Sequence, residues 1–185
     1  MHKYFMVLSL CLIVPVLHAA SPVAVTDWKA KVTSAMPLLG HRNWILIVDS
    51  AYPLQVSPGI ETVETGADQI DVVRAVLQSI QGSIHVRPDI IMDAELPYVP
   101  ENEVKGVSAY RTQIGDLLHG QNIESLPHDK IIGEIDQAGK TFRVLILKTT
   151  MTIPYSSVFI RLNCKYWSTD AEKDLREKMA AGPAK

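Results

Sequence analysis

Four histidines beyond the N-terminal segment are the first candidates for acid/base chemistry, because imidazole titrates near neutral pH. They are His41, His85, His119 and His128, and their spacing matches neither HExxH nor a Cys/His zinc pattern. The sequence also lacks GxGxxG, GxxxxGK[ST] and GxSxG. These absences exclude the commonest metalloprotease, nucleotide-binding and esterase signatures. His85 and His119 belong to no motif and are expected on the surface.

His41 and Asp49 flank one apolar run, residues 44–48, which is typical of a strand covered on both faces. An extended chain would separate these two side chains by roughly 26 Å. Either only one of them belongs to a site, or a curved loop or a neighbouring chain completes it. Structural roles stay open for both, since a histidine after glycine often forms a turn and an aspartate at a strand end often caps one.

The elements that must position these residues alternate between helix and strand. Periodicity and capping residues predict helices over 27–39, 68–80, 107–118 and 169–179, with another short helix starting near 128. Apolar runs predict strands over 44–48, 60–65, 89–92, 142–147 and 158–162, and the stretch 95–126 is expected to hold one helix. The pattern predicts a single three-layer α/β/α domain with a largely parallel or mixed sheet. Ligands of such sheets bind beyond the strand ends, which directs attention to Asp49–Pro53 and Asp93–Glu95.

The N-terminus has the order of a secretory signal. Lys3 precedes an apolar run over 5–17, and the small residues Ala19 and Ala20 follow. We therefore expect residues 1–20 to be a removable signal peptide, residues 21–185 to be the domain, and the protein to be exported, periplasmic or secreted. An uncleaved anchor is the alternative, and a lipoprotein signal at Cys11 fits less well. Removal of the segment leaves Cys164 as the one thiol.

The composition argues against a nucleic-acid partner and identifies no other partner. The 185 residues carry 18 Lys and Arg against 20 Asp and Glu, a formal net charge of -2, with no clustered basic stretch. This balance gives no electrostatic reason to bind nucleic acid.

Three local strings resemble the ribose pyranase and fucose mutarotase family. They are Leu39-Gly40-His41-Arg42-Asn43, then Val48-Asp49-Ser50-Ala51-Tyr52-Pro53 after the strand, and Pro154-Tyr155-Ser156-Ser157 before the last strand. The resemblance runs from about residue 28 to residue 167, more loosely over 98–125. The likeness rests on the order of these strings along the chain and on the spacing between His41 and Asp49.

The resemblance implies a monosaccharide mutarotase or pyranase that interconverts anomers, or pyranose and furanose forms, of a fucose- or ribose-like aldose. It makes His41 the general acid and assigns sugar binding to Asp49, His128, Tyr155 and Ser157. It implies no metal and no other cofactor. It also implies a ring-shaped homo-oligomer, such as a decamer, with sites at subunit contacts.

Departures from the family pattern leave other functions open. Asn43, Met151 and Ser157 stand where the family has aspartate, an acidic residue and asparagine. A catalytically inactive sugar-binding or structural oligomer of the same fold is the principal alternative, and a cell-envelope interaction module is another. His128 and Tyr155 also have structural alternatives, as a helix start and a packed loop aromatic. Trp28, Trp44 and Trp167 are expected to be core or interface anchors rather than sugar platforms.

Overall fold

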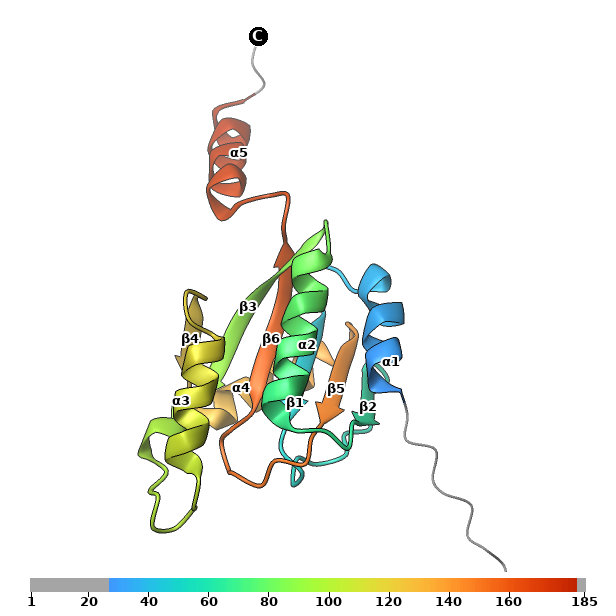
Figure 1. Ribbon diagram of the computed structural model, residues 1–185. Coiled ribbons are helices and arrows are strands. Elements are labelled where there is room, and N and C mark those ends of the chain that lie inside the picture. The colour runs from blue at the N-terminus through green and yellow to red at the C-terminus, as the bar shows by residue number, and fades with distance from the viewer. Residues whose placement is uncertain (1–26, 183–185) are drawn as a thin grey trace, which may run out of the picture.

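A six-stranded mixed sheet forms the centre of the computed structural model, which describes residues 27–182 (Figure 1). Its strands lie in the order β2-β5-β1-β6-β3-β4. The pairs β1/β5, β2/β5 and β3/β4 are parallel, whereas β6 runs antiparallel to both β1 and β3. The strand bounds are β1 Trp44–Val48, β2 Ile60–Glu64, β3 Val86–Asp93, β4 Ile123–Leu126, β5 Val144–Lys148 and β6 Val158–Cys164.

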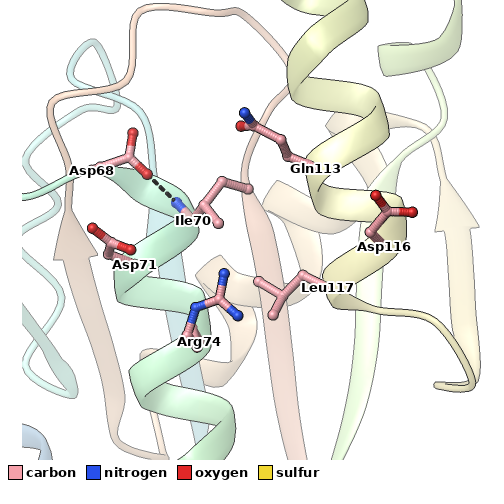
Figure 2. Close-up of a pocket in the computed structure, with 7 residues that line it drawn as sticks. All are labelled: Asp68, Ile70, Asp71, Arg74, Gln113, Asp116 and Leu117. Carbon is pink, nitrogen blue, oxygen red and sulfur yellow. Dashed lines mark hydrogen bonds between the residues drawn. The ribbon is translucent and has the colours of Figure 1, made fainter.

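Within the described residues, five α-helices precede, connect or follow these strands. They are α1 Trp28–Ala35, α2 Gln69–Gly82, α3 Val107–Leu117, α4 His128–Ala138 and α5 Thr169–Ala181, with short 3₁₀ turns at Met36–Leu38 and Leu96–Tyr98. Helix α2 begins as its sequence predicts, since the Asp68 carboxylate accepts a 2.8 Å hydrogen bond from the Ile70 N–H (Figure 2). The buried residues of α2 then recur at helical spacing.

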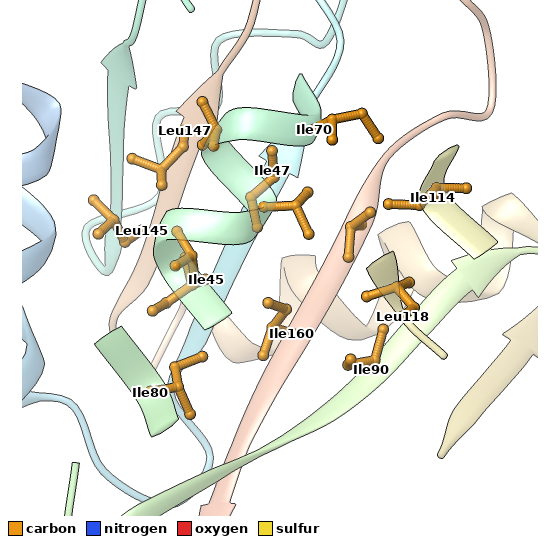
Figure 3. Packing of buried hydrophobic residues seen from close by; sticks show 14 of the residues in the cluster. Ile45, Ile47, Ile70, Ile80, Ile90, Ile114, Leu118, Leu145, Leu147 and Ile160 are labelled. Atoms are coloured by element: carbon orange, nitrogen blue, oxygen red, sulfur yellow. The ribbon is translucent and has the colours of Figure 1, made fainter. Parts of the chain in front are cut away.

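The sheet has helices on both faces, which confirms the predicted three-layer fold. Along the fully buried β1, Ile45 and Ile47 face a cluster with α1, α2 and α3 (Figure 3). Trp44, Leu46 and Val48 face a second cluster, to which α4 contributes Ile131 and Ile135. The layers are unequal, because among the described helices only α4 packs on the second face.

One strand was missed in the sequence. β4 lies inside the stretch 95–126, for which one helix was expected, and it pairs with β3 alone at the sheet edge. Its residues Ile123, Glu124 and Ser125 are all exposed, so no apolar alternation marks it. The helix expected to be short near residue 128 is α4, which continues for 11 residues.

Two sequence expectations concern the ends of the chain. The predicted signal peptide, residues 1–20, lies outside the described residues, as does Cys11. Within residues 27–182, no helix combines the length and the apolar character needed to cross a bilayer. Helix α5 follows β6 and lies apart from the sheet in Figure 1, and none of its residues is buried.

Candidate active site

Polar side chains gather at two opposite edges of the sheet. At the carboxyl edge, five parallel strands end and β6 begins; at the amino edge, those five strands begin and β6 ends. Asp49, His128, Tyr155 and Ser157 follow or precede strands at the carboxyl edge, whereas His41 precedes β1 at the amino edge. The structure therefore brings four of the five predicted site residues to one edge and places His41 at the other.

A histidine and a buried aspartate form the centre of the carboxyl edge. His128 is the first residue of α4, and its Nδ1 lies 2.9 Å from Oδ1 of Asp93, the last residue of β3. The Asp93 side chain has no exposed surface. An ionised carboxylate only accepts hydrogen bonds, so Nδ1–H of His128 donates and Nε2 is the ring nitrogen left to contact a ligand. Glu95 accepts the backbone N–H of His128 at 3.1 Å and so anchors the start of the helix.

Burial raises the pKa of Asp93 above its ordinary value of 3.8. The hydrogen bond and charge of His128 oppose this shift, while the carboxylates of Glu95 and Asp49 add to it. The second oxygen, Oδ2, is buried without a hydrogen-bond partner among the described residues. A buried acceptor of this kind calls for a functional explanation, because native structures satisfy most such groups.

Tyr155 packs against this pair. Its ring and that of His128 meet edge to face, with centroids 5.6 Å apart and planes at 82°. The backbone of Tyr155 has φ +58°, a left-handed conformation that costs free energy for a residue with a bulky side chain. Such strain is concentrated at functional sites. Ser157, two residues later, is buried.

A buried polar network holds the loop 149–157 that carries Tyr155. The amide nitrogen of Gln69 donates to the hydroxyl of Tyr110 and to the carbonyl of Ser156, and its amide oxygen accepts from the hydroxyl of Thr149. The Tyr110 hydroxyl donates to the same Ser156 carbonyl. Gln69 is fully buried, so these bonds replace the water contacts that its amide has lost. The network thereby fixes the loop behind Tyr155.

Asp49 also lies at the carboxyl edge. Its Oδ1 accepts a 2.8 Å hydrogen bond from the backbone of Ala51, so it does cap a turn, as one alternative from the sequence suggested. This bond occupies only one of the two carboxylate oxygens. Asp49 is half-buried, and its charge contributes to the raised pKa of Asp93. The capping role is therefore compatible with a ligand role.

At the amino edge, a hydrogen-bonded chain orients His41. Nδ1 of His41 lies 3.0 Å from Oδ1 of Asn163, whose Nδ2 donates to Oδ2 of Asp89 at 2.9 Å. The same Asn163 oxygen accepts the N–H of Cys164, which fixes the orientation of the amide. His41 Nδ1–H must then donate, and in the neutral ring Nε2 carries the lone pair. His41 is exposed.

The turn that presents His41 explains one departure from the family pattern. Asn43 accepts the N–H of Gly40 at 2.7 Å through Oδ1 and donates from Nδ2 to the Arg143 carbonyl at 3.2 Å. An ionised aspartate could supply the first bond but has no proton for the second. Asn43 therefore has a structural role here.

Several of these partners were not assigned a role in the sequence. Asp93 and Glu95 were noted only as following a strand, and no local motif marks Asn163 or Asp89.

The expectation that His85 lies on the surface was wrong: it is half-buried, and its two ring nitrogens lie 2.9 Å from the Ser83 hydroxyl and from the Leu39 carbonyl. This arrangement gives His85 a structural role. Within residues 27–182, no group of three or more His, Cys, Asp or Glu side chains has a metal-binding arrangement.

A groove of about 750 Å³ lies between α2 and α3 (Figure 2), and neither His41 nor His128 lines it. Asp68, Asp71, Arg74, Gln113 and Asp116 supply its polar lining. Asp68 is engaged in capping α2, and most of the other polar residues are exposed. The groove brings together no histidine, serine or cysteine, so its size alone does not make it an active site.

Comparison with solved structures identifies the class of fold. RbsD from Bacillus subtilis, complexed with D-ribose, aligns with a TM-score of 0.51 and 16% identity, over 75% of this chain and 93% of that chain. FucU from Bifidobacterium longum gives 0.48 and 13%, over 72% and 94%. The fucose mutarotase from Streptococcus pneumoniae, in complex with L-fucose, gives 0.46 and 16%, over 70% and 89%.

The chain thus has the three-layer fold of RbsD, and the resemblance seen in the local strings is confirmed at the level of the fold. No family model and no curated protein sequence matches the chain.

Proposed function

We propose that the protein is a monosaccharide mutarotase or pyranase that interconverts anomers or ring forms of a fucose- or ribose-like aldose. The observation that carries the proposal is the oriented imidazole of His41, whose Nδ1 is fixed by the Asn163–Asp89 chain so that Nε2 is the proton-transfer atom. The fold, which is that of a protein solved with D-ribose, supports the same conclusion.

The reaction needs proton transfers together with the breaking and re-forming of one carbon–oxygen bond. A base takes the proton of the anomeric hydroxyl, an acid protonates the ring oxygen, and the bond between the anomeric carbon and the ring oxygen breaks to give the open-chain aldehyde. A hydroxyl then attacks either face of that carbon, with the proton transfers reversed. Nothing is oxidised or reduced. In this proposal His41 is the general acid, and Asp49, His128 and Tyr155 bind sugar hydroxyls at the carboxyl edge.

The proposal includes a shared site, because His41 and the carboxyl-edge residues lie at opposite edges of one subunit. A head-to-tail ring would place the amino edge of one copy against the carboxyl edge of the next. The charges of the two edges support such contact. Connecting segments at the amino edge carry the cations Arg42, Lys140, Arg143 and Lys165 and, among the described residues, no carboxylate. Those at the carboxyl edge carry Asp49, Asp68, Glu95, Glu101 and Glu103 against Lys105.

The proposal also includes the cellular location of the protein. The signal-like order of residues 1–20 supports export, cleavage of this segment and a periplasmic or secreted protein acting on extracytoplasmic sugar.

Exchange NMR tests the activity. The rate of exchange between anomer signals of D-ribose, L-fucose and other aldoses should rise with enzyme concentration, and His41→Ala should reduce the catalysed rate by about 10²–10⁴-fold. His119→Ala is the matched control, since His119 is exposed and belongs neither to the polar group at the carboxyl edge nor to the hydrogen-bonded chain that orients His41. Equal rates for wild type and His41→Ala would disprove the role of His41.

The burial of Ser157 favours one second candidate, an inactive sugar-binding oligomer of the same fold. A buried hydroxyl offers a sugar less than the asparagine amide that the family has at this position. Sugar binding without faster exchange would support this candidate. Binding of none of the sugars would instead support the interaction module.

A further inference from the structure

The end of β6 and the segment that follows it form a groove that His41 also lines. The groove measures about 470 Å³, within the usual range for small-ligand sites. It is lined by His41 and Arg87, by Asn163 and Cys164 at the end of β6, and by Trp167, Ser168, Thr169 and Glu172 around the start of α5. Trp167 differs here from the other two tryptophans, which are buried in the core as expected: it is 43% exposed.

Trp167 is held in a fixed orientation. Its indole Nε1–H donates a 2.8 Å hydrogen bond to Oε2 of Glu172, and Oε1 of Glu172 accepts from Nε of Arg176 at 2.7 Å. The N–H of the ring is thus already used within α5. The contact that the indole still offers to the groove is its apolar ring surface.

The charges of the groove favour a neutral ligand. Arg87 is paired with Asp89 at 3.0 Å, and Glu172 is paired with Arg176. An anion such as phosphate would find no unpaired cation among the residues that line it. A neutral polyol fits better, because one face of a sugar ring is apolar while its hydroxyls can bond to imidazole, guanidinium and carboxylate groups.

We infer that Trp167 is a sugar-binding residue, whose ring supports the apolar face of a monosaccharide while His41 acts on it. The inference rests on the proposed function, since it takes His41 as the group that acts on the sugar. In the shared site, Trp167 enters the carboxyl edge of the next copy together with His41, from the same groove. This role goes beyond the sequence expectation that Trp167 is a core or interface anchor.

Three variants test the inference, with D-ribose and L-fucose as the probes. Trp167→Ala should weaken binding of the preferred sugar about tenfold, as loss of an aromatic ring contact does. Trp167→Phe keeps a ring face and should stay within about threefold of wild type. Tyr166→Ala is the matched control, because Tyr166 is the preceding residue, is 78% exposed and does not line the groove. Calorimetry gives the affinities, and exchange NMR on the same samples gives the rates.

The outcomes separate this inference from the proposed function. If wild type accelerates anomer exchange and Trp167→Ala binds as tightly as wild type, the inference is wrong and the proposed function stands. If wild type binds sugar in a way that depends on Trp167 but does not accelerate exchange, the inference stands and the catalytic proposal is wrong. If wild type neither binds D-ribose, L-fucose or any other aldose at millimolar concentration nor accelerates their exchange, both are wrong. Unchanged thermal unfolding midpoints check that each variant is folded.

Discussion

Asp93 shows how one residue can position a histidine of the candidate site at a cost in stability. It orients His128 through a 2.9 Å contact, yet its carboxyl group is buried with one oxygen unpartnered. Burial raises the pKa of Asp93, which means that the folded state resists the ionised form. The contribution of Asp93 to the free energy of unfolding is therefore most favourable below the unfolded-state pKa and is lost as pH rises through the folded-state pKa.

Asp93→Asn should remove this pH dependence, because asparagine keeps an oxygen that accepts from His128 and cannot ionise. Near pH 3.8 and below, wild type and variant should differ least; as pH rises, the variant should become the more stable by roughly 1 kcal/mol or more. The same change should lower catalysis, since an amide can flip and no longer fixes the tautomer of His128.

Urea denaturation across a pH series measures the stability difference, and exchange NMR measures the rate. The exposed Asp116→Asn on α3 is the control and should show no such trend. A stability difference that stays constant with pH would contradict the argument about burial.

The sequence predicted the site residues unevenly, and particular residues show why. Tyr155 follows from a local string and His128 from the family resemblance, and the structure places their rings together. Asn163 could not be recognised, because it acts through residues that are distant in sequence: His41 lies 122 positions away and Asp89 lies 74 away. Such contacts depend on the strand order, which places β6 between β1 and β3.

At the scale of the elements, strongly patterned segments were predicted best. The buried strand β1 and the capped helix α2 have clear sequence signals, whereas the exposed edge strand β4 has none, since its place depends on pairing with β3. The unequal helix layers were also beyond prediction. They depend on which side of the sheet each connection crosses.

Gly59 shows how closely two elements approach. It precedes β2, donates to the Gly139 carbonyl at the end of α4, and accepts from the N–H of Val144 at the start of β5. A Cβ at this position would clash with the backbone oxygens of Phe142 and Gly139. Since backbone cannot move aside as a flexible side chain can, a side chain here must separate the elements.

Gly59→Ala should therefore destabilise the protein by about 1–3 kcal/mol or more, as overpacking does. Gly133→Ala is the matched control, because Gly133 is exposed within α4 and its added Cβ would contact nothing within 4 Å. That change should instead stabilise the protein by about 0.5–1 kcal/mol through helix propensity. Urea denaturation of the two variants checks both signs, and a Gly59→Ala protein as stable as Gly133→Ala would show that this contact is not tight.

At the scale of the whole molecule, the question is whether one active site needs two copies. His41 and His128 lie at opposite edges of the sheet, and the connecting segments at those edges carry net charges of opposite sign. A head-to-tail contact would unite His41 of one copy with His128 of the next. A site built in this way can be restored by mixing two inactive proteins, provided that the subunits mix in one ring.

Co-expression of His41→Ala and His128→Ala subunits tests this arrangement. Each variant alone should be nearly inactive, because every site lacks one imidazole. In rings assembled at random from equal amounts, about a quarter of the contacts pair an intact His41 with an intact His128, so about a quarter of the wild-type exchange rate should return. Co-expression of His41→Ala with the double variant is the control and should stay inactive, since no subunit then supplies His41. If the mixture of single variants is no more active than its components, or if light scattering shows a monomer at micromolar concentration, the two histidines do not meet across a subunit contact.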